Sequence, residues 1–174
     1  MQASVGRGDA DIGLAYNPVA EIALRSVAIT RQPLQLVMAP GHPLGERRRI
    51  GLRSLAREKV ALLSEGHGVR LLLQRVEADQ RFHLVPVLET SSIDVLRRHA
   101  MAGRAITFLP AFAVAPEVKA GLLILRPLTD ALLAEASAHI LVRSQRRLPA
   151  PVERLIGILA AGMEAFRTSS PLVE

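Results

Sequence analysis

Residues 34–44 read Leu-Gln-Leu-Val-Met-Ala-Pro-Gly-His-Pro-Leu, and this stretch decides the predicted fold. An apolar run of strand character ends at Pro40, Gly41 and Pro43, so the backbone must leave a sheet and turn within a few residues. A short α/β segment precedes this turn and a longer one follows it. The stretch therefore predicts a hinge between two lobes with a ligand-sensing cleft between them, and we expect His42 to be packed in the turn for structural reasons.

The composition predicts a protein with a real hydrophobic core and few aromatic residues. A chain of 174 residues is long enough to bury about 70% of the surface of its unfolded form. Hydrophobic residues make up 49% of it but aromatic residues only 3%, so the core must consist of Leu, Val, Ile and Ala. The formal charge of +6 raises the possibility of a nucleic-acid partner. Without clustered aromatic side chains there is no platform for base stacking. The run Arg47-Arg48-Arg49 is interpreted as a solvated loop, and a phosphate-binding cluster is the alternative, with no neighbouring motif to support it.

Several classes of site are excluded or disfavoured by the residues present. The absence of cysteine excludes disulfides, thiolate catalysis and thiolate zinc sites. No Gly-x-Ser-x-Gly motif and no Gly-rich nucleotide fingerprint occur, so we expect neither an enzyme nor a cofactor. The histidines never approach metal-ligand spacing, so no metal is expected either. They are His42, His67, His83, His99 and His139.

The first residues contain no apolar segment of the kind that directs export, and the longest apolar run, 105–116, is interrupted by Pro110. These features predict a cytoplasmic protein without a membrane span.

Hydrophobic patterning predicts an alternation of strands and helices along the chain. The chain begins on a polar turn rather than on a strand, so it looks cut short. The expected strands are 12–16, 24–29, 34–39, 60–63, 84–88, 105–109, 122–125 and 137–143, and the expected helices are 50–56, 69–78, 93–102, 112–120 and an amphipathic C-terminal helix that starts near Pro149. We expect the strand that ends at Ala39 to carry the chain between the lobes and the strand 137–143 to bring it back beside the first.

Two strand-to-helix turns are the candidate ligand-binding elements. The first is Ser64-Glu-Gly-His-Gly68 and the second is Thr90-Ser-Ser92, in which Ser91 and Asp94 match a capping box. Both turns follow buried strands, and open α/β sheets bind ligands at the carboxyl ends of parallel strands. A helix that starts there also presents unpaired backbone N–H groups, which favour an anionic group. Turn closure and helix capping alone are the alternative explanation for the same residues.

Many short motifs in a consistent order resemble the effector-binding domain of LysR-type transcriptional regulators. The resembling stretches are Gly8-Asp-Ala-Asp-Ile-Gly-Leu-Ala15, Pro40-Gly-His-Pro-Leu44, Leu52 with Leu55, Arg70, Thr90-Ser-Ser92, Ala102-Gly103, Ile106-Thr-Phe-Leu-Pro110 and Arg143 to Pro151. The resemblance implies an α/β, two-lobed type 2 periplasmic-binding-protein-like fold with two crossover strands. It also implies that the first lobe is incomplete, because the family's first strand, first helix and second strand have no counterpart here.

The resemblance further implies a division into lobes and a set of effector contacts. Residues 1–36 and 139–167 are expected to form the partial first lobe, residues 37–138 the second lobe, and residues 168–174 a disordered tail. The implied effector-binding residues are Tyr16, Asn17, Ser64, Glu65, Gly66, His67, Ser91, Ser92 and Phe108.

The expected function is the sensing of a small, carboxylate-bearing metabolite in the cleft between the lobes. DNA would be bound only through an N-terminal winged helix-turn-helix that this chain does not contain. A free-standing solute-binding protein of the same fold and an inactive, truncated gene product are the alternatives. Because the missing elements would leave apolar surface open, including a face of the C-terminal helix, we expect the chain to associate with itself as a homodimer or larger oligomer.

Overall fold

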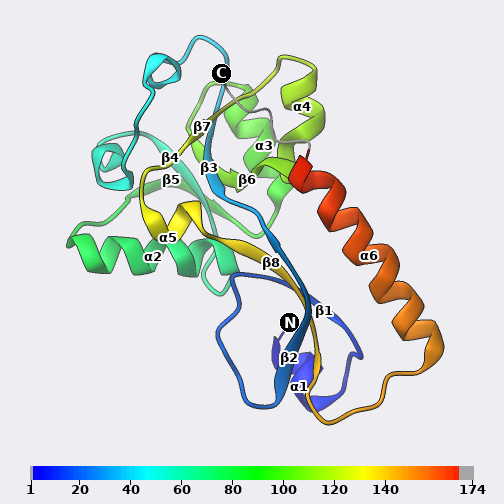
Figure 1. The fold of residues 1–174 in the computed structure, drawn as a ribbon. Coiled ribbons are helices and arrows are strands. Elements are labelled where there is room, and N and C mark those ends of the chain that lie inside the picture. The colour runs from blue at the N-terminus through cyan, green and yellow to red at the C-terminus, as the bar shows by residue number, and fades with distance from the viewer. Residues whose placement is uncertain (1, 169–174) are drawn as a thin grey trace. The chain divides into compact units, whose positions relative to one another are not determined.

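The chain folds into two units, which are described separately (Figure 1). The computed structural model describes residues 2–168, with side chains described as far as Met163. Unit 1 consists of residues 1–32 and 136–174, and unit 2 of residues 33–135. The sequence places the two crossings a few residues later, after 36 and after 138. Apart from Thr168, which ends a helix, the tail expected at 168–174 lies outside the described residues.

Unit 1 is built around a three-stranded antiparallel sheet in the order β1-β8-β2. Its strands are β1 (Gly13–Tyr16), β2 (Leu24–Arg31) and β8 (Ser137–Arg143), and its helices are α1 (Gln2–Arg7) and α6 (Ala150–Thr168). The central strand β8 buries Ile140, Leu141 and Val142, which form an uninterrupted apolar run. Such a run is typical of a strand that is covered on both faces.

The chain passes from unit 1 to unit 2 immediately after Gln32. The backbone N–H of Gln32 donates to the carbonyl of Ala136 (2.8 Å), so the outgoing and returning segments are joined within unit 1. Gln32 itself is only 4% exposed. The hinge predicted at Pro40–Pro43 is therefore wrong, because the chain leaves unit 1 before β3 begins.

Unit 2 contains two sheets, one antiparallel and one parallel. The first has the order β6-β3-β7, and the second pairs β4 with β5 in parallel. A parallel bridge between Val60 and Ile106 links the second sheet to the segment that leads into β6. The strands are β3 (Leu34–Met38), β4 (Val60–Leu63), β5 (Pro86–Thr90), β6 (Thr107–Pro110) and β7 (Ile124–Pro127).

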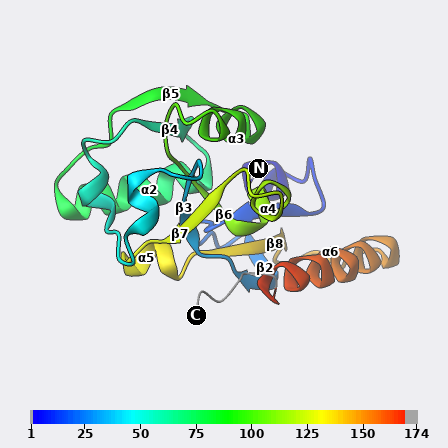
Figure 2. The ribbon, with the colours of Figure 1, turned by 90° about the horizontal axis from the view of Figure 1, so that it is seen from above.

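The strand β3 is the central strand of the antiparallel sheet (Figure 2). Leu36, Val37 and Met38 are all fully buried, so this stretch belongs to the core of unit 2. It pairs with β6 and β7, whereas β8 pairs with β1 and β2, so β3 and β8 are strands of different sheets.

The Pro-Gly turn that follows β3 lies inside unit 2. Gly41 has a φ of +80°, which suits glycine, and the ring Nδ1 of His42 accepts from the N–H of Leu44 (3.3 Å) at the start of a 3-10 helix. His42 therefore has the structural role that was expected of it.

The helices of unit 2 follow the predicted pattern in most places. They are η1 (Pro43–Glu46), η2 (Leu52–Leu55), α2 (Gly68–Gln80), α3 (Ile93–Met101), η3 (Ala111–Val114), α4 (Ala115–Lys119) and α5 (Ala131–Ala134). The predicted helix 50–56 is a short 3-10 helix, and the predicted helix 112–120 is divided into η3 and α4. The division falls before Pro116, which has no N–H and suits the first turn of a new helix.

A buried ion pair joins the first turn of α2 to its last turn. Arg70 Nη1 donates to Glu77 Oε1 (2.6 Å), and Glu77 Oε2 accepts from the N–H of Leu84 (3.4 Å). The two side chains are only 10% and 3% exposed. Arg70 Nε is buried and has no partner among the described residues. The pair therefore fixes the two ends of α2 to the core, but the desolvation of the guanidinium is incompletely compensated.

The C-terminal helix α6 packs on the sheet of unit 1 through only part of its apolar surface. Val152, Ile156 and Leu159 are half-buried, whereas Leu155 is 47% exposed and Ile158 is 68% exposed. The predicted amphipathic helix is confirmed, and an apolar part of it faces solvent as expected. None of the described helices is both long and apolar enough to cross a membrane.

Candidate functional site

The two predicted turns lie side by side at one edge of the parallel sheet in unit 2. In the register of β4 and β5, Leu63 pairs with Thr90, and the N–H of Ser64 donates to the carbonyl of Thr90 (2.9 Å). Both strands thus end at the same level, and each is followed within a few residues by a helix, α2 or α3. The prediction that the two turns lie at the carboxyl ends of parallel strands is confirmed.

The N-terminus of α2 is left without a side-chain cap. His67 occupies the N-cap position with extended backbone angles, and its side chain makes no capping hydrogen bond. Gly66, with a φ of +85°, turns the chain into this position, which a residue with a β-carbon adopts only under strain. The first backbone N–H groups of the helix, beginning at Gly68, have no partner within the helix. They form the strongest candidate anion-binding feature of unit 2.

The N-terminus of α3 is capped, but by a different serine from the one predicted. Ser92 Oγ accepts from the N–H of Val95 (3.4 Å), whereas Ser91 was expected to cap the helix with Asp94 as its partner. The reason is local: Thr90 Oγ1 accepts from the N–H of Ser92 (3.1 Å), and this turn delays the helix by one residue. Ser91 is consequently exposed, with its hydroxyl available to a ligand.

Asp94 is engaged with two arginines rather than with the helix start. It accepts from Arg98 Nε (2.8 Å) and from Arg97 Nη2 (3.1 Å). The hydrogen bond from Arg98 is the main reason why the pKa of the Asp94 carboxyl is lowered from its usual value. This carboxylate therefore belongs to an exposed helix-surface network.

The charges around the two turns are few. Glu65 is exposed between Ser64 and Gly66, and His67 is half-buried. The nearest arginine along α2 is Arg70, whose Nη1 already donates a hydrogen bond to Glu77. An anion at this edge would therefore be held by backbone N–H groups and hydroxyls rather than by a cationic side chain.

The candidate residues of unit 1 lie at the end of β1. The Tyr16 hydroxyl donates to the backbone carbonyl of Gln32 (2.6 Å), and burial raises the pKa of this hydroxyl well above its usual value. Asn17 has a φ of +47°, and its N–H donates to the carbonyl of Ser137 (2.8 Å). Left-handed backbone at a residue other than glycine is uncommon, and such strain tends to occur at functional positions.

Phe108 does not fit the role that was inferred for it. It lies in β6 opposite Leu36 of β3 and is only 1% exposed. A side chain enclosed in this way contributes to packing, so its burial argues against contact with a ligand.

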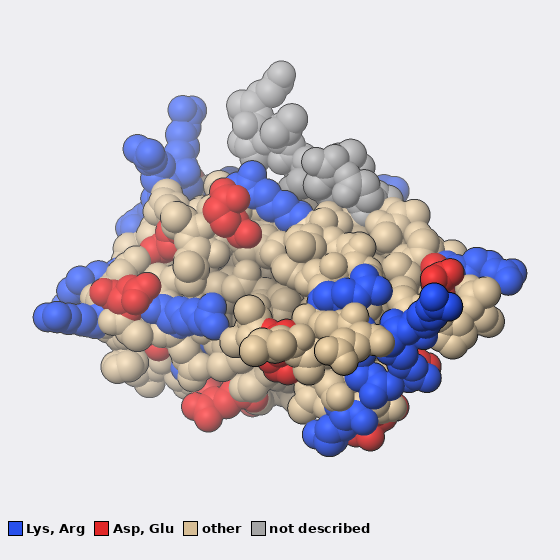
Figure 3. Space-filling model, turned by 60° about the horizontal axis from the view of Figure 1, so that its bottom comes forward, with Lys and Arg blue, Asp and Glu red and all other residues tan. Residues whose placement is uncertain are grey.

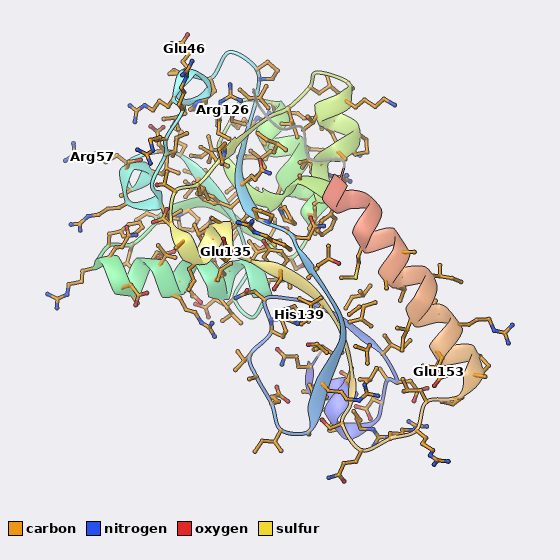
Figure 4. The ribbon with its side chains drawn as sticks, viewed as in Figure 1. Glu46, Arg57, Arg126, Glu135, His139 and Glu153 are labelled. Carbon is orange, nitrogen blue, oxygen red and sulfur yellow. The ribbon has the colours of Figure 1, made fainter. Side chains whose placement is uncertain are left out.

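A polar cluster on the sheet of unit 1 was not anticipated from the sequence. His139 Nδ1 lies 2.8 Å from Ser26 Oγ, and His139 Nε2 lies 2.8 Å from Ser137 Oγ. Figure 4 labels His139 on β8. Partial burial lowers the pKa of this imidazole below its usual value. The alternation of Ser137 and His139 places them on one face of the strand, but Ser26 is brought there only by the pairing of β2 with β8.

Comparison with protein families gives one match that covers nearly the whole chain. Residues 1–164 match the model of the LysR substrate binding domain. The chain is 26% identical over 157 residues to the HTH-type transcriptional regulator CbbR of Rhizobium meliloti, which covers 90% of this chain and 46% of that protein. A second CbbR, from Sinorhizobium medicae, is 28% identical over 121 residues, which are 69% of this chain and 39% of that protein. The chain therefore spans less than half the length of these curated relatives.

Solved structures show a similar fold. The CcmR regulatory domain of Synechocystis PCC6803 in complex with 2-PG has a TM-score of 0.78 at 18% identity, over 94% of this chain and 78% of that chain. The effector-binding domain of QuiR in complex with shikimate has a TM-score of 0.75 at 12% identity, over 94% of this chain and 77% of that chain. These likenesses show the periplasmic-binding-protein-like fold of such domains.

Proposed function

Because the chain belongs to the family of LysR substrate-binding domains, we propose that it is the effector-sensing part of a transcriptional regulator and that its effector is a small, carboxylate-bearing metabolite. The family is one of regulators rather than enzymes, and its members recognise small molecules and bind DNA through an N-terminal helix-turn-helix. Such a role would place the protein in the cytoplasm. A free-standing solute-binding protein receives less support, since the relatives are HTH-type regulators.

The observation that carries the proposal is the uncapped N-terminus of α2 at the carboxyl edge of β4 and β5. Helix N-termini favour an anion by about 0.3 to 1 kcal/mol through their dipole, and each charge-assisted hydrogen bond adds about 1.5 to 3 kcal/mol. In this proposal, the hydroxyl groups of Ser64 and Ser91 in the adjoining turns add to the binding of the anion. A carboxylate with a single charge suits this edge better than a doubly charged group, because no free arginine or lysine is found among the described residues of the two turns.

We also propose a role for each of several other residues that the sequence analysis expects in the site. Gly66 and His67 shape the turn that presents the N–H groups of α2. Glu65 repels a carboxylate, so we assign it to a hydroxyl or amino group elsewhere on the effector. The family resemblance also implies a role for Tyr16 and Asn17 in unit 1, and the left-handed backbone of Asn17 supports a functional role at that position.

The backbone contribution is tested by the variant Gly68→Pro. Proline is tolerated at the first position of a helix but has no N–H to donate, and the extended backbone of His67 (ψ 137°) suits the residue before a proline. Ala131→Pro makes the same change at the first position of α5, whose N-cap Asp130 is also extended (ψ 118°). The second variant is therefore a matched control.

Isothermal titration calorimetry with a panel of aromatic and aliphatic carboxylic acids provides the measurement. We expect at least one acid to bind, Gly68→Pro to weaken its binding by about 10- to 100-fold, and Ala131→Pro to leave it unchanged. Failure of every acid to bind would refute the carboxylate proposal. An unchanged affinity in Gly68→Pro would show that the ligand lies elsewhere.

Self-association is also part of the proposal, because unit 1 leaves apolar side chains exposed. Leu155 and Ile158 of α6 are 47% and 68% exposed, and Ile29 of β2 is 60% exposed. Ile158→Glu should reduce the mass found by light scattering, whereas Leu132→Glu, at a residue of unit 2 that is 42% exposed, should not. A monomeric unmodified chain would contradict this part of the proposal.

A further inference from the structure

The segment from Glu46 to Lys59 carries most of the excess positive charge of the chain. It contains six cationic side chains against the two carboxylates of Glu46 and Glu58, a net charge of +4 within a chain whose formal net charge is +6. The six are Arg47, Arg48, Arg49, Arg53, Arg57 and Lys59. From the sequence, the first three of them are interpreted as a solvated loop, with a phosphate-binding cluster as the alternative.

Within this segment the structure separates the charged residues from the apolar ones. All six cationic side chains are exposed, whereas Ile50, Leu52 and Leu55 are at most 1% exposed. The backbone is also fastened to unit 2: the carbonyl of Ile50 accepts from the N–H of Thr129 (3.0 Å), and the N–H of Leu52 donates to Asp130 Oδ2 (2.7 Å). The cationic side chains therefore extend from a backbone segment that these hydrogen bonds and the buried apolar side chains fix to unit 2.

These cations lack carboxylate partners, which several arginines elsewhere in the chain have. Arg97 and Arg98 pair with Asp94, and Arg7 pairs with Asp9. On the face shown in Figure 3, Lys and Arg side chains are interspersed with Asp and Glu side chains. For the six cations of 46–59, the described part of the chain provides no ion pair, and Arg53 donates only to the backbone carbonyl of Gln80 (3.0 Å). Figure 4 shows Arg57 and Glu46 pointing outward from unit 2.

We propose that the surface formed by residues 46–59 binds the phosphate backbone of duplex nucleic acid without regard to sequence. Phosphate contacts require exposed cations on a fixed backbone and little else. A protein interface, in contrast, is centred on apolar and aromatic side chains, and the apolar members of this segment are buried. The proposal goes beyond effector sensing and does not depend on it. In a DNA-binding regulator this surface would add a second, non-specific contact to the duplex.

The salt dependence of binding measures how many phosphates the surface neutralises. With six contacts at most, a plot of log affinity against log salt concentration should have a slope of about −5.4, and each lost cation should reduce its magnitude by about 0.9. The triple variant Arg47→Gln, Arg48→Gln, Arg49→Gln should therefore have a slope of about −2.7. Between 50 and 200 mM salt, the affinity should fall by about 1,800-fold for the unmodified chain and by about 40-fold for the variant.

The assay is fluorescence anisotropy of a labelled 30-base-pair duplex of arbitrary sequence, titrated with the 174-residue chain at several KCl concentrations. The matched control replaces Arg25, Arg75 and Arg104 by Gln, which removes the same charge from exposed positions outside the segment. The control should keep the slope of the unmodified chain, and circular dichroism should show that both triple variants are folded.

Two outcomes would overturn the proposal. Equal losses of slope in the two variants would mean that only the net charge of the chain attracts DNA. Binding to poly-glutamate without binding to the duplex at 50 mM salt would assign the surface to an acidic protein.

Discussion

Removing Glu77 should be far more damaging than removing both members of its ion pair. In the variant Glu77→Leu, the guanidinium of Arg70 would remain 90% buried without its partner, and arginine cannot lose its proton to relieve the cost. We expect a loss of about 3 to 5 kcal/mol in the free energy of unfolding. Because Arg70 Nε already lacks a partner, little in the surroundings can replace the lost hydrogen bond.

The reciprocal change, Arg70→Met, should cost less. Glu77 would keep its hydrogen bond from the N–H of Leu84 and lie near the ring of His83. The double variant Arg70→Met, Glu77→Leu should match the unmodified chain or exceed its stability by about 1 to 4 kcal/mol, since the cost of burying two charges disappears.

Urea denaturation followed by circular dichroism measures all three variants, and the slope of each transition checks that the same surface is exposed. Asp94→Asn, which removes an exposed partner of Arg97 and Arg98, serves as the control and should leave the midpoint nearly unchanged. A loss below about 1 kcal/mol in Glu77→Leu, or additive losses in the double variant, would refute the argument that the pair is desolvated and coupled.

Three further changes test individual residues of unit 1. Tyr16→Phe removes the hydrogen bond to the carbonyl of Gln32 and should lower the free energy of unfolding by about 0.5 to 1.5 kcal/mol in urea titrations; an unchanged midpoint would show that water replaces the hydroxyl. Asn17→Val should cost about 1 to 2 kcal/mol while Asn17→Gly costs nothing, because valine resists a φ of +47°, and equal effects would rule out backbone strain. The pKa of His139 is lower in the folded chain than in the unfolded chain, so the unfolded state binds its proton more tightly; stability should fall as the pH drops below about 6.5, and His139→Gln should weaken this dependence in thermal melts at pH 5 and pH 7.5. An unaltered pH dependence in that variant would mean that other groups cause it.

Local patterns in the sequence predicted most strands and the longer helices. The continuous apolar run Val60–Leu63 is found as β4 with the predicted bounds, because a short run of this kind is buried wherever it lies. The apolar spacing of residues 152–163 likewise predicted α6. The edge formed by Ser64 and Thr90 was also predictable, since parallel strands end at a common edge.

Features that depend on tertiary contacts were missed. The helix α1 (Gln2–Arg7) contains Gly6 and has weak intrinsic propensity, but Val5 is fully buried, so packing supports it. The hinge was misplaced because the Pro-Gly turn is a strong local pattern, whereas the true crossing at Gln32 is marked only by a hydrogen bond to Ala136. The cluster around His139 depends on strand pairing across more than 100 residues of chain, which no local pattern encodes.

The hydrogen bond between Gln32 and Ala136 also has a consequence for the order of folding. Unit 2 is continuous in sequence, but unit 1 is interrupted by it, and β8, the central strand of unit 1, follows the interruption. On the ribosome, all of residues 33–135 must emerge before β1 and β2 can acquire the strand that lies between them. The loop-closure entropy of that pairing is smaller once unit 2 is compact and its two ends are held together. Unit 2 should therefore fold first and bring the halves of unit 1 together, which reverses the usual order from the N-terminus.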